Sequence, residues 1–236
     1  MQFFFADSIS GQTAHLGNEE ARHCQKVLRH LPGDNIYVTD GRGSMFLASI
    51  QSFSSSGAVL QILETYPGYG ESNRNVRLAV SFLRLKDRFE WLMEKAVELG
   101  VTEIFPLICS RTDKFKGKIK EERLEKIILT ALKQSARSKL PALHEPLSVE
   151  KFVQLPAEGF RALAWCETKH MLQTHETTIR QAATVTLMIG PEGDFTPEEA
   201  NFAKENGYEI VSLGETRLRT ETAAIYGLSI FKMLRE

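Results

Sequence analysis

One apolar run of the chain ends in Met188-Ile189-Gly190-Pro191-Glu192-Gly193-Asp194-Phe195. A second ends in Leu213-Gly214-Glu215-Thr216-Arg217-Leu218-Arg219-Thr220-Glu221-Thr222-Ala223-Ala224. A buried strand that ends in a glycine-bearing turn is where an α/β fold exposes backbone N–H and C=O groups to a ligand. Two such turns so near each other in the chain predict one cleft that is built from both.

Working outward from these turns, strands and helices alternate over residues 74–236. Apolar runs predict strands, and positions spaced three and four apart predict helices. Thr196 followed by Pro197 and Glu199 predicts a capped helix start. The predicted strands are 76–83, 103–109, 162–166, 185–189 and 208–213, and the predicted helices are 87–99, about 124–135, 196–207 and from 220 onward. This alternation predicts an α/β domain with a largely parallel sheet covered by helices.

Residues 1–70 have a different pattern, in which short β segments predominate, and this pattern predicts a separate small β module. Closely spaced β segments with short turns are typical of a small barrel. A short helix over 19–29, capped by Asn18, interrupts them, and a linker over about 66–73 ends the module. The predicted strands are 3–5, 36–39, 45–52 and 58–63.

Composition limits the classes of protein that this chain can represent. The 236 residues are 42% hydrophobic and 25% charged, which is ordinary for a folded soluble domain. Cys24, Cys109 and Cys166 stand far apart, so we expect reduced thiols in a cytoplasmic protein rather than disulfides or zinc. The six histidines form no ligand pattern, and we therefore expect no metal. No apolar run approaches the length of a membrane span.

The charge of the chain is unevenly distributed. The net charge is −1, yet residues 111–139 contain ten Lys or Arg against four acids. Such a segment can bind phosphate backbones electrostatically, with an affinity that falls as salt is added. A solvated helix face explains the same pattern, and charge alone does not decide between them.

The common nucleotide and hydrolase motifs are absent. Gly41-Arg42-Gly43 lacks the third glycine of a dinucleotide fingerprint and is followed by a strand pattern, so it predicts a hairpin turn. The two late turns therefore carry the functional argument. One interpretation is an ordinary loop with a solvent ion pair, and the favoured one is a ligand cradle edged by charged groups.

The late turns also resemble a known family. The chain is similar here to the SPOUT methyltransferases, and most similar to the RsmE family. The matching residues are Leu187 to Gly193, Leu213-Gly214 and Leu218-Arg219-Thr220-Glu221-Thr222-Ala223. That family methylates N3 of uracil-1498 in 16S ribosomal RNA. The resemblance extends to Val27-Leu28-Arg29, Pro32-Gly33-Asp34, Asp40-Gly41, 94–101 and 134–138. Asp194 departs from it, because the family usually repeats a glycine there, although aspartate tolerates left-handed backbone better than most residues.

The resemblance implies a specific architecture and a specific ligand. We expect a PUA-like β-barrel over 1–70 and a SPOUT domain over 74–236 with a C-terminal trefoil knot. We also expect a homodimer that binds S-adenosyl-L-methionine and acts on 16S rRNA or the small ribosomal subunit. By position, the expected cofactor-binding residues are Ile189, Gly190, Glu192, Gly193, Leu213, Gly214, Leu218, Arg219, Thr222 and Ala223, with Leu213 and Leu218 enclosing the adenine.

The chemistry of N3 methylation leads to a hypothesis about catalytic residues. Uridine N3 keeps its proton at neutral pH, so the site must supply a base or a cation that stabilises the anion. We expect Arg219 to stabilise that anion and Glu192 or Glu221 to accept the proton. Glu221 is explained more simply as an acid in the first turn of a helix. The expected RNA-binding residues are Arg22, Lys26, Arg29, Lys86, Arg111, Lys114 and Arg137.

Two other functions fit parts of the pattern. A ribose 2′-O-methyltransferase of the same fold also uses an arginine, but the N-terminal β module and residues 218–223 favour the base methyltransferase. A non-catalytic RNA-binding protein that assists ribosome assembly would keep the fold without the activity, and only Asp194 points in that direction.

Overall fold

The computed structural model describes residues 3–112 and 120–234, and these form two compact units. The first unit comprises the chain up to Ser72 together with Leu129–Leu140. The second comprises Asn73–Ile128 and the chain from Pro141 onward. The division therefore falls inside helix α3 (Glu121–Gln134), whose last residues belong with the first unit, a feature that the sequence did not predict.

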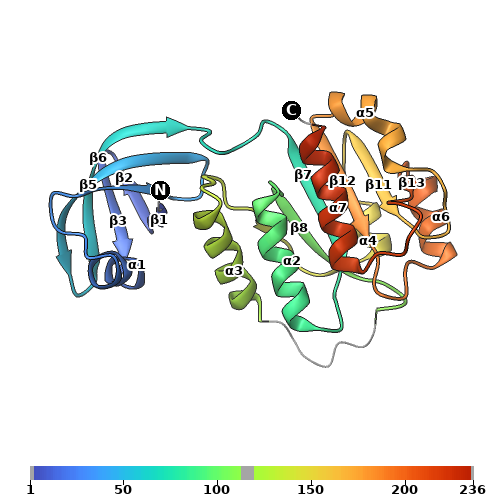
Figure 1. The fold of residues 1–236 in the computed structure, drawn as a ribbon, viewed down its shortest axis with the longest axis horizontal. Helices are drawn as coiled ribbons and strands as arrows, with labels where there is room; N and C mark the ends of the chain where they lie inside the picture. The colour runs from blue at the N-terminus through green and yellow to red at the C-terminus, as the bar shows by residue number, and fades with distance from the viewer. Residues whose placement is uncertain (1–2, 113–119, 235–236) are drawn as a thin grey trace. The chain divides into compact units, whose positions relative to one another are not determined.

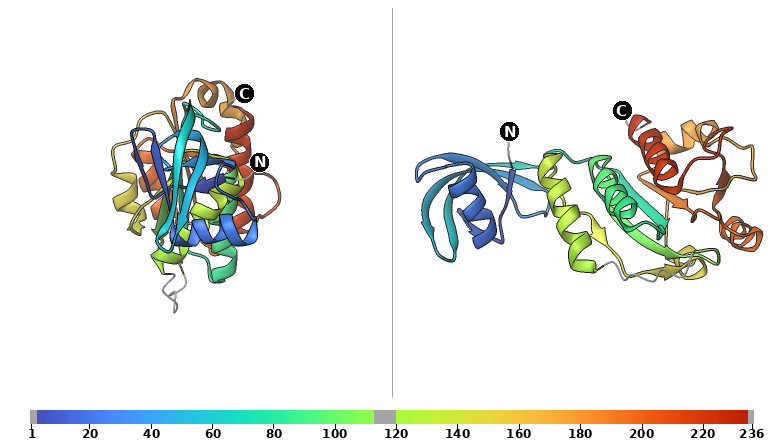
Figure 2. Two further views of the ribbon diagram at one scale, coloured as in Figure 1. Left: turned by 90° about the vertical axis from the view of Figure 1, so that its left-hand side faces the viewer. Right: turned by 60° about the horizontal axis from the view of Figure 1, so that its bottom comes forward.

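The first unit is a six-stranded sheet in the order β1-β4-β5-β6-β3-β2. Only β1 and β4 pair in parallel, and the other strand pairs are antiparallel. The two edge strands follow each other in the chain, so the sheet curls until its edges approach, as in a small barrel; Figures 1 and 2 show the bent strands beside α1. The strands are β1 (Phe3–Phe5), β2 (Ser8–Ser10), β3 (Thr13–Gly17), β4 (Asn35–Thr39), β5 (Ser44–Ser54) and β6 (Gly57–Pro67).

The short helix of this unit differs from its prediction. It is α1 (Asn18–Arg22), which continues as a π-helical turn over His23–Val27. Gly17, not Asn18, is its N-cap, and no side chain caps it. The reason is that β3 runs directly into the helix, so that Gly17 is still extended and Asn18 is already helical. The sequence also failed to predict β2 and β3, which at three and five residues are too short to show a clear period.

The second unit confirms the predicted α/β class. Its sheet has the order β10-β8-β7-β12-β11-β13, with β9 paired to β8, and every pairing is parallel. The strands are β7 (Asn75–Ser81), β8 (Glu103–Ile108), β9 (Ala142–Leu143), β10 (Leu147–Ser148), β11 (Phe160–Ala164), β12 (Thr184–Ile189) and β13 (Glu209–Val211).

Helices cover both faces of this sheet. On one face α2 (Lys86–Glu98) and α7 (Thr220–Met233) lie side by side, and α7 packs on β12 (Figure 1). On the other face α4 (Val149–Val153) and α6 (Pro197–Glu205) close a core that includes Phe105, Phe152 and Phe195. A turn of 3-10 helix over Leu172–His175 and α5 (Glu176–Gln181) connect β11 to β12. Within the described residues no helix is long and apolar enough to cross a membrane.

The capping box predicted at Thr196 is confirmed. The Thr196 hydroxyl accepts the N–H of Glu199 at 3.2 Å, and the Glu199 carboxylate accepts the N–H of Thr196 at 2.8 Å. The same carboxylate also accepts the N–H of Ser110 at 2.8 Å. One side chain thus starts α6 and fastens the loop that follows β8, at the carboxyl edge of the sheet.

Candidate functional site

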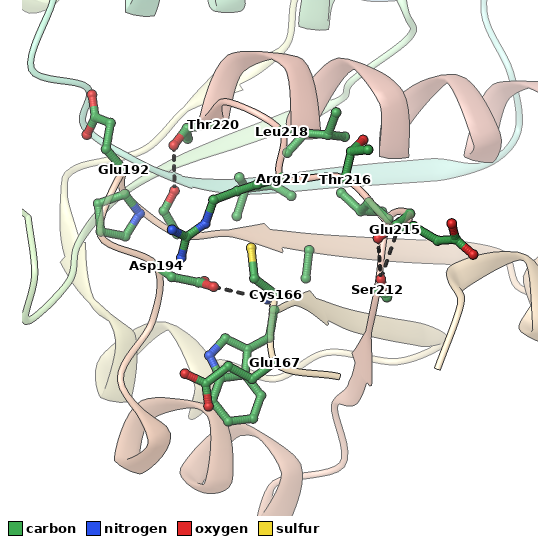
Figure 3. A pocket seen from close by; sticks show the side chains of 18 residues that line it. Cys166, Glu167, Glu192, Asp194, Ser212, Glu215, Thr216, Arg217, Leu218 and Thr220 are labelled. Carbon is green, nitrogen blue, oxygen red and sulfur yellow. Dashed lines mark hydrogen bonds between the residues drawn. The ribbon is translucent and has the colours of Figure 1, made fainter. Parts of the chain in front are cut away.

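A pocket of about 350 Å³ opens at the carboxyl ends of β11, β12 and β13. Its lining comes from the segments that follow these three strands and from the first turns of α7 (Figure 3). The prediction that the two late turns form one cleft is confirmed, since both line this pocket. The lining residues are 164–167, 189–192, 194, 212–218, 220 and 223.

The turn after β12 is shaped by close packing. A Cβ atom on Gly190 would lie 3.0 Å from the Phe195 nitrogen and 3.1 Å from its ring, so a side chain there would collide with Phe195. The N–H of Asp194 donates to the Pro191 carbonyl at 2.9 Å and closes the turn. The residue of this turn with left-handed backbone is Asp194, at φ 63°, and not a glycine. This observation accords with the tolerance of aspartate for that conformation.

The turn after β13 is joined directly to the first. Gly214 has φ 143°, a backbone conformation that favours glycine. The Ser212 hydroxyl donates to the Gly214 carbonyl at 3.0 Å. The Thr220 hydroxyl, at the start of α7, donates to the Gly190 carbonyl at 3.1 Å. The beginning of α7 is therefore fixed to the turn of β12, and the two walls of the pocket are held together.

Most of the residues expected to bind a cofactor line this pocket, and three do not. Gly193 lies beside the pocket, where its carbonyl accepts the Arg111 guanidinium at 2.9 Å. Arg219 and Thr222 are also absent from the lining. The residues brought together as expected are Ile189, Gly190, Glu192, Leu213, Gly214, Leu218 and Ala223.

The three residues expected to act in catalysis occupy different positions. Glu192 lines the pocket, and its carboxylate accepts the Arg84 N–H at 3.2 Å. Arg219 is the extended N-cap residue of α7 and is exposed, and no described side chain pairs with its guanidinium. Glu221 is buried outside the pocket lining, 3.4 Å from Arg88. The structure thus favours the simpler explanation of Glu221 as an acid in a helix first turn.

Several charged side chains line the pocket, and of these only Glu192 was assigned a role from the sequence. The described lining residues include four carboxylates, Glu167, Glu192, Asp194 and Glu215, and one guanidinium, Arg217. Figure 3 shows Arg217 reaching toward Cys166 and Asp194. Partial burial and the adjoining Asp194 carboxylate raise the pKa of the Cys166 thiol, and Arg217 opposes that shift.

The sequence did not indicate that residues 164–167 line the pocket, because their role depends on which strands are neighbours in the sheet. The apolar run ending at residue 166 was predicted as a strand to its last residue, whereas β11 ends at Ala164 and the next residues turn into the pocket. In a parallel sheet the loops that follow neighbouring strands meet at one edge. Strand order, which the sequence does not show, places β11 next to β12.

The residues expected to bind RNA fall into four groups. Arg22, Lys26 and Arg29 are exposed on the first unit. Lys86 and Arg111 are exposed on the second, although Arg111 also holds the carbonyls of Gly193 and Phe195 at 2.9 and 3.3 Å. Arg137 is 4% exposed and is paired with Glu71, a position that does not present its guanidinium to phosphate. Lys114 lies outside the described residues.

Comparison with known proteins identifies the family. A family model described as an RNA methyltransferase domain matches residues 70–232, and an RNA methyltransferase PUA domain matches residues 16–63. The chain belongs to this family of RNA methyltransferases. It is 32% identical over 98% of its length to ribosomal RNA small subunit methyltransferase E of Synechocystis, and the match covers 76% of that protein. The Bacillus subtilis protein of the same name is 27% identical, over 97% of this chain and 95% of that one.

A solved structure agrees with this assignment. The crystal structure of ribosomal RNA small subunit methyltransferase E from Neisseria gonorrhoeae, bound to S-adenosyl methionine, superposes with a TM-score of 0.88. The two chains are 29% identical, and the superposition covers 99% of this chain and 98% of the other. The fold of this RNA methyltransferase is therefore the SPOUT fold with a PUA-like N-terminal unit. Among the described residues, no group of three histidine, cysteine or acidic side chains is arranged to hold a metal.

Proposed function

We propose that this RNA methyltransferase transfers a methyl group from S-adenosyl-L-methionine to N3 of a uridine of the 1498 class in 16S rRNA. The observation that carries the proposal is the pocket at the carboxyl edge of the sheet, built from the two turns by which the sequence resembles the family. The names of the relatives, ribosomal RNA small subunit methyltransferase E, support the substrate.

The pocket suits this cofactor in size and chemistry. Its volume of about 350 Å³ lies within the range of small-molecule sites. Ile189, Leu213, Leu218 and Ala223 provide apolar walls for an aromatic base. The four carboxylates of the lining favour a ligand that carries positive charge, as a sulfonium does. When bound, S-adenosyl-L-methionine supplies an electrophilic methyl group whose leaving thioether is neutral.

The remaining chemistry falls to side chains of the protein. Alignment of the reacting atoms is the main contribution, and it is worth several kcal/mol, on the order of a well-oriented intramolecular reaction. The uridine must also lose its N3 proton. We assign Arg219 to stabilise the resulting anion because its guanidinium is free of described partners and Leu218 and Thr220, its neighbours in the chain, both line the pocket. Glu192 is the better placed proton acceptor, since Glu221 is buried against Arg88.

A pair of variants distinguishes the two arginines of this turn. Arg219→Ala should lower kcat by about 10²-fold, the usual effect of removing one donor to a developing anion. Its affinity for S-adenosyl-L-methionine, measured by calorimetry, should stay within about threefold of wild type because Arg219 does not line the pocket. Arg217→Ala is the matched comparison. Because Arg217 lines the pocket, this variant should change the affinity for S-adenosyl-L-methionine. Near-normal turnover of Arg219→Ala with binding intact would remove Arg219 from the mechanism.

The RNA is proposed to dock through exposed cations on both units. Arg22, Lys26 and Arg29 on the first unit and Lys86 and Arg111 on the second remain candidates for phosphate contacts. Such contacts position the RNA, while selection of the uridine requires its base to enter the pocket. We also propose a homodimer, for which the exposed Tyr226 and Met233 of α7 provide apolar surface, and the expected C-terminal knot remains a prediction.

The reaction itself is tested with purified protein, small ribosomal subunits or their free rRNA, and labelled S-adenosyl-L-methionine. The proposal predicts 3-methyluridine on nucleoside mass spectrometry and a reverse-transcription stop at the modified base. A 2′-O-methylated nucleoside would assign a different reaction to the same fold. Failure to bind the cofactor at millimolar concentration would favour a non-catalytic assembly protein.

A further inference from the structure

Asp194 has an unusual position in the pocket wall. It is the only described non-glycine residue of the two late turns with a positive φ, and its side chain lines the pocket. One carboxylate oxygen accepts the N–H of Phe195 at 2.8 Å. The other accepts the N–H of Cys166, 28 residues earlier in the chain, at 3.0 Å. The carboxylate therefore bridges the turn after β12 and the segment after β11.

This bridge attaches the main chain of the segment between Trp165 and His170 to the turn after β12. Trp165 donates its N–H to Val211 at 2.9 Å, and the next main-chain bond to another segment comes at His170, whose carbonyl accepts the N–H of Ser212. Between those two points the main chain is bonded to another segment through the Cys166 N–H, which donates to Asp194, and the Cys166 thiol also contacts the side chains of Asp194 and Arg217. Asp194 thus holds the main chain at Cys166, which lines the pocket together with Glu167.

The hydrogen bond from the Cys166 N–H to the Asp194 carboxylate is stronger than a hydrogen bond between two neutral backbone groups. A hydrogen bond from a backbone N–H to a charged carboxylate is worth more than one between neutral groups. The left-handed conformation of Asp194 aims the carboxylate back across the pocket edge, and the Arg111 bonds to Gly193 and Phe195 hold the residues on either side. Asp194 is consequently held in place within the turn after β12, and its carboxylate can hold the segment after β11.

We propose that Asp194 is a positioning residue that sets the affinity for S-adenosyl-L-methionine by tethering the 165–169 segment to the turn after β12. The proposal rests on the proposed function for the identity of the ligand. Asp194 acts through the wall that it holds and not on the reacting atoms. Its loss should therefore raise the KM for the cofactor while leaving the KM for RNA, and kcat at saturating cofactor, nearly unchanged.

Two variants separate the carboxylate from the backbone conformation. Asp194→Gly removes the carboxylate and keeps the left-handed backbone without strain. Asp194→Asn also tolerates that backbone and retains one oxygen acceptor, so it should lie between wild type and the glycine variant. Glu198→Gln is the matched control, because its exposed carboxylate lies four residues further along the chain and outside the pocket.

The test combines hydrogen exchange of the ligand-free protein with calorimetric titration of S-adenosyl-L-methionine. For Asp194→Gly we expect faster exchange in a peptide covering 165–170 and about tenfold weaker cofactor binding, the effect of losing a charge-assisted hydrogen bond. Unchanged exchange, or unchanged affinity, would overturn the proposal. If wild type bound no cofactor, the proposed function would fail, and the exchange of the ligand-free variants would still decide whether Asp194 tethers the segment.

Discussion

The three cysteines show how strongly position decides the chemistry of a single residue. Burial raises the pKa of the Cys24 thiol to about 11 and that of the Cys109 thiol to about 12. Cys166 is exposed and lines the pocket. Because the thiolate is the reactive species and needs access to the reagent, the three thiols should differ widely in reactivity.

In the native protein, N-ethylmaleimide should modify one thiol rapidly, that of Cys166. Saturating S-adenosyl-L-methionine should slow this reaction, because the thiol faces the proposed site. Since the pKa of Cys166 lies above its ordinary value of 9.0, the rate should keep rising beyond pH 9 instead of levelling off. Asp194→Gly removes a cause of that shift, so its rate should level off at a lower pH.

Peptide mass spectrometry over time locates the label, and Cys166→Ser provides the background. Equal rates with and without cofactor would place the ligand away from Cys166 and contradict the assignment of this pocket.

Asp194 also shows what residue types alone can predict. Its left-handed backbone was foreseeable, because aspartate is one of the few residues that tolerate it. Its bond to Cys166 was not foreseeable, since the partner is a backbone N–H that becomes a neighbour only when β11 and β12 pair.

At the scale of helices and strands, the start of α6 supports the pocket from outside. Thr196→Ala removes the hydroxyl that caps the helix and should lower the free energy of unfolding by about 0.5–2 kcal/mol, as N-cap removals do. The change is measured by urea denaturation. Glu205→Ala, at the exposed far end of the same helix, is the control and should have little effect. A loss in the control equal to that of Thr196→Ala would contradict the role of the cap.

The predicted elements succeed where the sequence carries a long periodic signal. Helices α2, α3 and α7 and strands β7, β8 and β12 lie within a few residues of their predicted bounds. The two-residue strands β9 and β10 and the short helices α4 and α5 were not predicted. Segments so short have too few turns or alternations to show a period, and tertiary packing determines them.

At the scale of the whole molecule, the end of α3 and the residues that follow it, Leu129–Leu140, belong to the first unit. The Glu71 carboxylate accepts two bonds from the Arg137 guanidinium, at 2.8 and 3.2 Å. It also accepts the N–H groups of Ser138 and Lys139, at 2.9 and 2.8 Å. Both side chains of this pair are nearly buried. One carboxylate thus holds residues more than sixty positions away, a contact that no local pattern predicts.

Glu71→Ala should destabilise the first unit by about 3–5 kcal/mol, because it removes one member of a nearly buried ion pair. Hydrogen exchange should rise in peptides from 57–72 and 129–140 and change little in the sheet of the second unit. Glu64→Ala, an exposed acid on β6, is the control. Unaltered exchange in the first unit would show that the pair does not secure it.

The central claim, that this RNA methyltransferase modifies N3 of one uridine in small-subunit rRNA, is tested most directly in cells. Nucleoside mass spectrometry and reverse transcription would be applied to 16S rRNA from cells with the gene, without it, and without it but complemented by wild type or Arg219→Ala. The account predicts a single 3-methyluridine that is lost on deletion, restored by wild type and not restored by Arg219→Ala. An unchanged 3-methyluridine content in the deletion strain would contradict it.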